Sequence, residues 1–187
     1  MQTTILENDS IRKMALPITV EQYHRLGEAG IIEEKIELLN GVIIEKMPKS
    51  PEHTYVVRKL YELLGVLIPE ELFILKEDPL TLVRSEPEPD LAIVQGNKEE
   101  YKFLHPTTAL LVIEVALSSI DIDREKASIY AGANIPEYWL FDLNLKQVEV
   151  FSQPQGDAYQ KKKIHDISDT IPLKIVKGGN VNLKGLF

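Results

Sequence analysis

The chain has 187 residues and 44% hydrophobic content, enough for one compact domain with a sizeable core and short for two. We therefore predict a single domain over residues 1–187, with residues 1–16 as a loose arm. The absence of cysteine excludes disulfides, thiolate chemistry and cysteine-ligated metal clusters. The formal net charge of −8 argues against a protein that coats nucleic acid, but it does not exclude an enzyme whose acidic site is screened by metal ions.

The sequence has no run of eighteen apolar residues, so we expect no membrane segment. Residues 1–9 lack a basic region followed by an apolar stretch, and we therefore expect a cytoplasmic protein. The charge is uneven, because six lysines and two aspartates follow Gln160. This basic end could meet a phosphate backbone, or it could be an ordinary solvated edge.

In chain order, the first expected element is a helix over Val20–Leu26, with Thr19 as its N-cap and Gly27 or Gly30 as its end. His24 lies in that helix, where we expect a surface residue and not a ligand.

A hairpin over Ile36–Ile44 follows, because Asn40-Gly41 between apolar runs favours a two-residue type I′ turn. Glu37 lies in its first strand, where alternation leaves both an outward and an inward orientation open.

A second helix is expected from Ser50-Pro51 to Leu67, where apolar residues recur at helical spacing and would cover one face of a sheet. His53 lies in its first turn, where backbone N–H groups favour anions, so a site at this helix entrance is plausible.

Short runs rich in β-branched and apolar residues predict the strands. They are Leu72–Lys76, Leu80–Val83, Asp90–Val94, Leu110–Ala116, Tyr138–Asp142 and an antiparallel pair, Gln147–Phe151 with Tyr159–Ile164. A helix over Ile122–Ala133, closed by Asn134 and Pro136, joins two of them as a strand-helix-strand unit with parallel pairing. The fold class is therefore α/β.

Two of the buried strands carry a carboxylate, Asp90 at the start of one and Glu114 near the end of the other. A carboxylate in the interior costs several kcal/mol unless it is paired or bound to a metal. Lys126, at the start of the next helix, is the nearest cation expected to point back at Glu114. Asp90 reaches the same edge only if its strand is offset or antiparallel.

Two carboxylates about 4 Å apart repel by roughly 4 kcal/mol at an effective dielectric of about 20, and one lysine offsets this only once. If Glu37 also turns inward, a divalent cation becomes the natural further member. Asp90, Glu114, Glu37 and the main-chain carbonyl of Val115 are hard oxygen ligands, which suit Mg²⁺ or Mn²⁺. The constellation indicates a metal-dependent phosphodiester hydrolase, in which Lys126 orients water or offsets charge on the phosphorane.

Pro89-Asp90 followed by Glu114-Val115-Ala116 resembles the PD-(D/E)xK nuclease motif, with Ala116 where the lysine usually stands. In some branches of that superfamily the lysine has moved to the next helix, and Lys126 fits this arrangement. An ordered set of motifs over Ile18–Phe151 resembles, more specifically, the Uma-two family of restriction-endonuclease-like proteins. The set comprises Glu37–Gly41, Met47-Pro48 with His53, Pro89-Asp90, Ile113–Val115, Lys126 with Tyr130, and Ile135–Trp139.

The resemblance implies a restriction-endonuclease-like core, with a central mixed β-sheet flanked by helices, and Mg²⁺-dependent endonuclease activity. Carried onto this chain, it implies Asp90, Glu114 and Lys126 as metal and catalytic positions, Glu37 as a further acidic ligand and His53 as an accessory. The expected partner is nucleic acid, in the first instance DNA, and a homodimer would address both strands.

Two other interpretations stay open. The chain could be a nuclease-fold module without catalysis that binds nucleic acid or a protein, because Ala116 replaces the usual lysine and the total charge is acidic. Alternatively, Glu114 and Lys126 could be a buried ion pair that only fixes helix against sheet.

Overall fold

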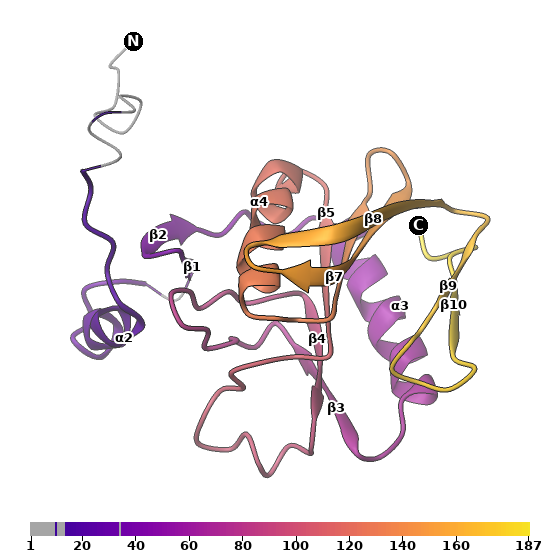
Figure 1. Cartoon of the computed structure of the whole chain (residues 1–187), viewed down its shortest axis with the longest axis horizontal. Coiled ribbons are helices and arrows are strands. Elements are labelled where there is room, and N and C mark those ends of the chain that lie inside the picture. The colour runs from indigo at the N-terminus through magenta and orange to yellow at the C-terminus, as the bar shows by residue number, and fades with distance from the viewer. Residues whose placement is uncertain (1–9, 11–13, 34) are drawn as a thin grey trace.

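In this computed structural model, residue 10 and residues 14–33 and 35–187 are described (Figure 1). Residues 1–9 and 11–13, most of the expected N-terminal arm, lie outside the described residues. Within the described ranges, every helix is too short or too polar to span a bilayer.

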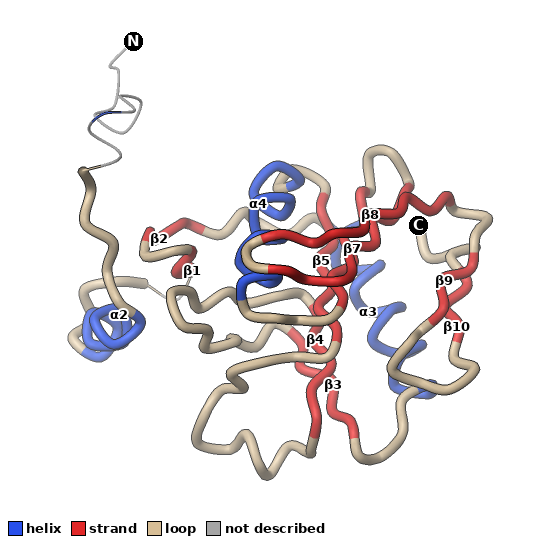
Figure 2. Tube along the Cα trace, viewed as in Figure 1, coloured by secondary structure: helices blue, strands red, loops and turns tan. Residues whose placement is uncertain are grey.

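A six-stranded sheet forms the centre of the molecule, in the order β3-β4-β5-β6-β7-β8 (Figure 2). Its strands are β3 (Leu72–Lys76), β4 (Leu91–Gln95), β5 (Leu111–Ala116), β6 (Glu137–Asp142), β7 (Gln147–Gln155) and β8 (Ala158–Asp166). The β5–β6 pair is parallel, as the strand-helix-strand unit predicts, and every other neighbouring pair is antiparallel. The predicted α/β class, with a mixed sheet flanked by helices, is confirmed.

The sheet has an apolar layer on each face, because successive residues of its central strands point to opposite sides. On one face Ile113 and Trp139 pack with α3 (Pro51–Leu67), and on the other Val112 packs with Tyr130 of α4 (Ile120–Gly132). A charged side chain on the buried central strand β5 is therefore enclosed between sheet and helix.

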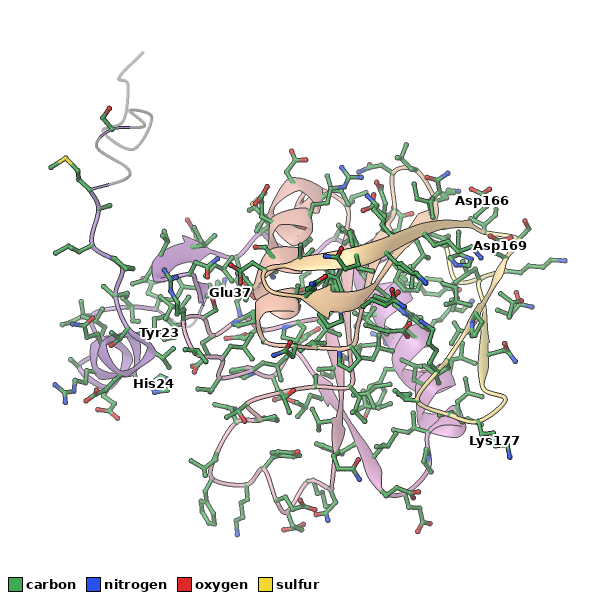
Figure 3. All side chains as sticks on the ribbon, in the orientation of Figure 1. Tyr23, His24, Glu37, Asp166, Asp169 and Lys177 are labelled. Carbon is green, nitrogen blue, oxygen red and sulfur yellow. The ribbon has the colours of Figure 1, made fainter. Side chains whose placement is uncertain are left out.

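The N-terminal part consists of α2 (Val20–Glu28) and a hairpin of β1 (Ile36–Leu39) and β2 (Val42–Glu45). The expected Thr19 cap is present as a full capping box. His24 has a 44% exposed side chain and contacts Glu86, which agrees with a surface position (Figure 3).

The predicted type I′ turn of the hairpin is confirmed, because Asn40 and Gly41 have φ values of 49° and 80° and Leu39 pairs directly with Val42. The peptide N–H of Gly41 donates to Arg84, which fixes the hairpin against the loop that leads to the sheet.

Leu80–Val83 was expected to be a strand, and this is wrong. The peptide N–H of Leu80 donates to Pro87 and that of Leu82 donates to Ser85, so the chain folds back on itself in a tight loop. A short hairpin of β9 (Thr170–Pro172) and β10 (Asn180–Asn182) was not foreseen, and it packs onto the core on the α3 face.

Candidate active site

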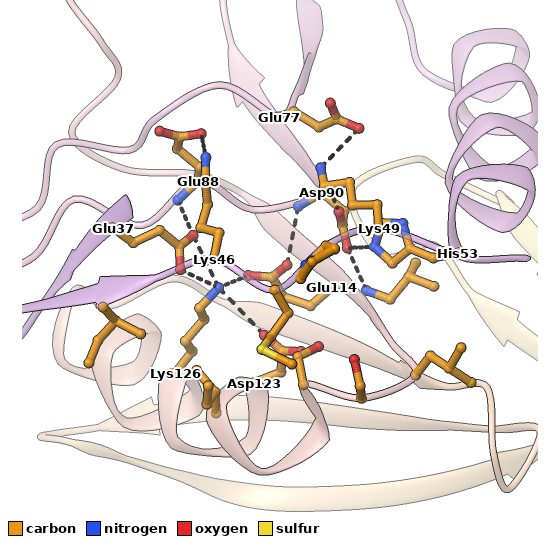
Figure 4. A pocket seen from close by; sticks show the side chains of 18 of the residues that line it. Glu37, Lys46, Lys49, His53, Glu77, Glu88, Asp90, Glu114, Asp123 and Lys126 are labelled. Atoms are coloured by element: carbon orange, nitrogen blue, oxygen red, sulfur yellow. Dashed lines mark hydrogen bonds and ion pairs between the residues drawn. The ribbon is translucent and has the colours of Figure 1, made fainter. Parts of the chain in front are cut away.

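The pairing of β4 with β5 brings Asp90 and Glu114 together. The strands run antiparallel with Leu91 opposite Ile113, so the start of β4 lies beside the carboxyl end of β5. The peptide N–H of Asp90 donates to Glu114 Oε2 at 3.2 Å. Asp90 was expected to reach Glu114 only if the two strands were offset or antiparallel, and they are antiparallel. The two carboxylates therefore line one pocket (Figure 4).

Helix α4 places Lys126 over Glu114, because the connection after β5 is short and the helix packs back on the same face. Lys126 Nζ lies 2.9 Å from Glu114 Oε1 and 3.0 Å from Glu37 Oε2. Burial alone would lower the pKa of Lys126, but Glu114, Glu37 and Asp123 raise it above the usual range. This direction favours the charged ammonium form of Lys126 inside the fold.

Glu37 reaches the site from the β1–β2 hairpin. The sequence left both an outward and an inward orientation of this side chain open, and the structure shows the inward one. It is only 4% exposed, and its Oε1 accepts hydrogen bonds from the peptide N–H of Glu88 and from Lys126. The hairpin thus contributes a carboxylate to a site that is otherwise built on the sheet and its helices.

The amino end of α3 supplies His53. Ser50 caps this helix by accepting the peptide N–H of His53, and His53 Nε2 lies 3.0 Å from Asp90 Oδ2. The same carboxylate oxygen accepts the peptide N–H of Val115 at 2.8 Å. His53 Nδ1 is buried with no hydrogen-bond partner among the described residues, so Nε2 is the ring nitrogen through which His53 contacts Asp90.

Three further residues touch the predicted set; Tyr130 was named only as part of the family motif with Lys126, and the other two were not singled out in the sequence. Asp123 Oδ1 lies 3.5 Å from Lys126 Nζ, the Tyr130 hydroxyl donates to Glu114 Oε1 at 2.9 Å, and Lys49 Nζ lies 3.6 Å from Asp90 Oδ1. Helical spacing signals the first two, since Asp123 and Tyr130 stand three residues before and four after Lys126. No comparable pattern marks Lys49.

The pocket holds more acid than base. Four buried carboxylates line it, Glu37, Asp90, Glu114 and Asp123, against one buried lysine. Burial raises the pKa of Glu114, Lys126 lowers it, and the neighbouring carboxylates raise it further, to about 8. A divalent cation would relieve this excess negative charge.

The donor chemistry fits a hard divalent cation, because the pocket of about 200 Å³ is lined by the carboxylates of Asp90 and Glu114 and by Val115. Within the described ranges, no three acidic or histidine side chains form a ready-made metal centre. Lys126 Nζ contacts both Glu37 and Glu114, whereas Asp90 is fixed by His53 and by the peptide N–H of Val115.

A family model named Uma2, described as "Putative restriction endonuclease", matches residues 20–183. A crystal structure of a "putative nuclease belonging to DUF820" from Anabaena variabilis is similar, with a TM-score of 0.73 and 18% sequence identity. The match covers 91% of this chain and 98% of that chain, which shows a common fold. A comparison with curated proteins found no match.

Proposed function

The chain belongs to the Uma2 family of restriction-endonuclease-like proteins, and we propose that it is a divalent-metal-dependent DNA endonuclease. In this proposal the protein hydrolyses phosphodiester bonds, uses Mg²⁺ or Mn²⁺, and works as a homodimer on duplex DNA. The cytoplasm, where such an enzyme meets DNA, is the expected compartment.

One observation carries the proposal: the buried side chains of Lys126, Asp90 and Glu114 line the same pocket. Asp90 and Glu114 are 5% and 4% exposed, and Lys126 is 5% exposed. Such a cluster is costly for folding, and buried charged groups that gather in a pocket with raised pKa values are typical of a catalytic site. The third interpretation, a simple ion pair, explains Glu114 and Lys126 but not Asp90.

Asp90, Glu114 and the carbonyl of Val115 would hold the metal, which supplies polarisation of the scissile phosphate and raises the acidity of water. Glu114, Glu37 and Asp123 raise the pKa of Lys126, so in this proposal Lys126 acts as a cation and not as a base. Its task is to orient the attacking water and to offset negative charge that develops on the phosphorane.

The remaining residues position this set. His53 and the peptide N–H of Val115 together fix one oxygen of Asp90, so that the other oxygen faces the pocket. Glu37 is the further acidic member of the site. It shares the ammonium of Lys126 with Glu114, so this lysine does not neutralise Glu114 alone.

The test is nicking of supercoiled plasmid by purified protein in Mn²⁺ or Mg²⁺. Asp90→Ala should reduce the rate at least about 100-fold, because it removes a metal ligand. The matched control is Asp121→Ala, an exposed aspartate at the start of α4, which should nick like the wild type. Equal nicking by the wild type and Asp90→Ala would point to a contaminant and contradict the proposal.

The alternative is a nuclease-fold module without catalysis. It is favoured by Ala116 at the end of β5, where the resemblance expects a lysine, and by the lack of a preformed three-ligand group among the described residues. Calorimetry with Mn²⁺ separates the two, because a module that has lost its chemistry need not retain a metal site.

A further inference from the structure

Asp90 is balanced by a cation that comes from the surface. One of its oxygens, Oδ2, is fixed by His53 and by the peptide N–H of Val115. The other, Oδ1, lies 3.6 Å from Lys49 Nζ, which is within ion-pair range but longer than a hydrogen bond. The contact is therefore electrostatic and weakly oriented.

Lys49 has a second partner outside the pocket. Its Nζ lies 3.1 Å from Glu77 Oε1, and both side chains are about 40% exposed. Glu77 has a φ of 61°, an uncommon conformation for glutamate, and its peptide N–H donates to the carbonyl of Asp90. This strained residue thus holds a surface carboxylate next to the loop that carries Asp90 (Figure 4).

We propose that Lys49 is an exchangeable counter-ion, which neutralises Asp90 in the metal-free protein and moves away to contact a DNA phosphate when a divalent cation is bound. The inference rests on the proposed function, since it concerns the same metal site. It assigns to Lys49 a regulatory and substrate-binding role at the mouth of the pocket.

The physical reason is competition between like charges for one oxygen. A lysine ammonium and a metal ion cannot both sit against Asp90 Oδ1 without strong repulsion. Lys49 is half-exposed and can leave at little cost, whereas the buried Lys126 is held by three carboxylates. Glu77 keeps the displaced ammonium at the mouth, where a phosphate oxygen can replace it.

The first measurement is calorimetric titration of Mn²⁺ into the metal-free protein without DNA. Lys49→Met removes the competing charge and should tighten Mn²⁺ binding about 3- to 10-fold. Lys98→Met is the control, because Lys98 is an exposed lysine that does not line this pocket. It should leave the Mn²⁺ affinity near that of the wild type, as should the charge-conserving Lys49→Arg.

The second measurement is fluorescence anisotropy of a labelled duplex in Ca²⁺ over a range of salt concentrations. Lys49→Met should bind the duplex more weakly, and its salt dependence should fall by about one ion. Tighter metal binding together with weaker DNA binding is a combination that a purely structural lysine would not give. Equal urea midpoints for all variants would exclude misfolding as the cause.

Unchanged or weaker Mn²⁺ binding by Lys49→Met, with the wild type binding normally, would overturn this inference and leave the endonuclease proposal intact. The absence of Mn²⁺ binding in every protein would overturn both. If Mn²⁺ affinities shift as expected but no protein nicks plasmid, the proposed function fails while the role of Lys49 at the metal site stands.

Discussion

Glu114 occupies the least favourable position for a negative charge in the candidate site. Its carboxylate is buried, and Asp123, Asp90 and Glu37 surround it with like charge. Lys126 compensates only in part, so the pKa of Glu114 rises from its ordinary value of 4.5 to about 8. Folding of the metal-free protein therefore makes this carboxyl group bind a proton more readily than an exposed glutamate does.

A pH dependence of stability follows for the metal-free protein. Between pH 4.5 and about 8, folded Glu114 holds a proton that the unfolded chain has released, so folding takes up a proton. The free energy of unfolding should therefore be highest at the acidic end of this window and fall as the pH rises through it. Urea unfolding in EDTA at pH 5.5, 6.5 and 7.5 measures this fall.

Glu114→Gln is the matched variant, because it keeps the shape and cannot ionise. Its free energy of unfolding should depend less steeply on pH than that of the wild type over the same window. Parallel pH profiles for the two proteins would show that Glu114 titrates normally in the folded state.

At the scale of single residues, the sequence identifies a charged side chain as a site candidate when it interrupts an apolar run. Asp90 and Glu114 stand out because each interrupts a run of strand-forming residues, and Lys126 follows from its place on the next helix. Lys49 lies in a polar connection where a lysine needs no explanation, so its proximity to Asp90 emerges only from tertiary structure. The orientation of Glu37 was undecided for a related reason, since alternation allows both faces.

At the scale of elements, local signals predict what local interactions determine. The capped helices and the Asn40-Gly41 hairpin are set by neighbouring residues, and their positions agree with the structure. Leu80–Val83 has the composition of a strand. However, the N–H groups of Leu80 and Leu82 donate to the carbonyls of Pro87 and Ser85 and are therefore not available for pairing with a strand. Pairing depends on distant partners, which no local pattern contains.

The hairpin of β1 and β2 carries Glu37. The position of this hairpin depends on Gly41 in its turn. The peptide N–H of Gly41 donates to Arg84, and a side chain at this position would overlap Pro17. Gly41 also has a φ of 80°, which only glycine adopts without strain. The approach of Glu37 to Lys126 therefore depends on the absence of a side chain at a remote turn.

Gly41→Ala should destabilise the protein by about 1 to 2 kcal/mol more than Gly156→Ala, as measured by urea unfolding. Gly156 is the matched control, because its φ of 57° is also positive but open space surrounds it. Gly41→Ala should also slow nicking by shifting Glu37. Equal losses of stability in the two variants would mean that backbone strain alone, and not contact with Pro17, sets the requirement for glycine.

At the scale of the whole molecule, fold and substrate are separate questions. The Anabaena variabilis protein keeps the same fold at 18% identity, so few surface residues need be shared. On this chain, Lys161 and Lys163 of β8 are exposed and form a basic stretch on an acidic protein. Binding of DNA by these lysines, or mere protection of the edge strand β8 by their charge, is a property of this surface and not of the fold.

Each chain offers one pocket with Asp90, Glu114 and Lys126, and one such site cuts one strand at a time. If the protein is a homodimer, two sites address both strands, and plasmid should become linear without much accumulation of nicked circles. Sedimentation equilibrium should then give twice the 21.2 kDa mass of the chain. A monomer should instead accumulate nicked circles first. Early linear product from a protein that sediments as a monomer would contradict the link between assembly and double-strand cleavage, because a single pocket would have to serve both strands in one encounter.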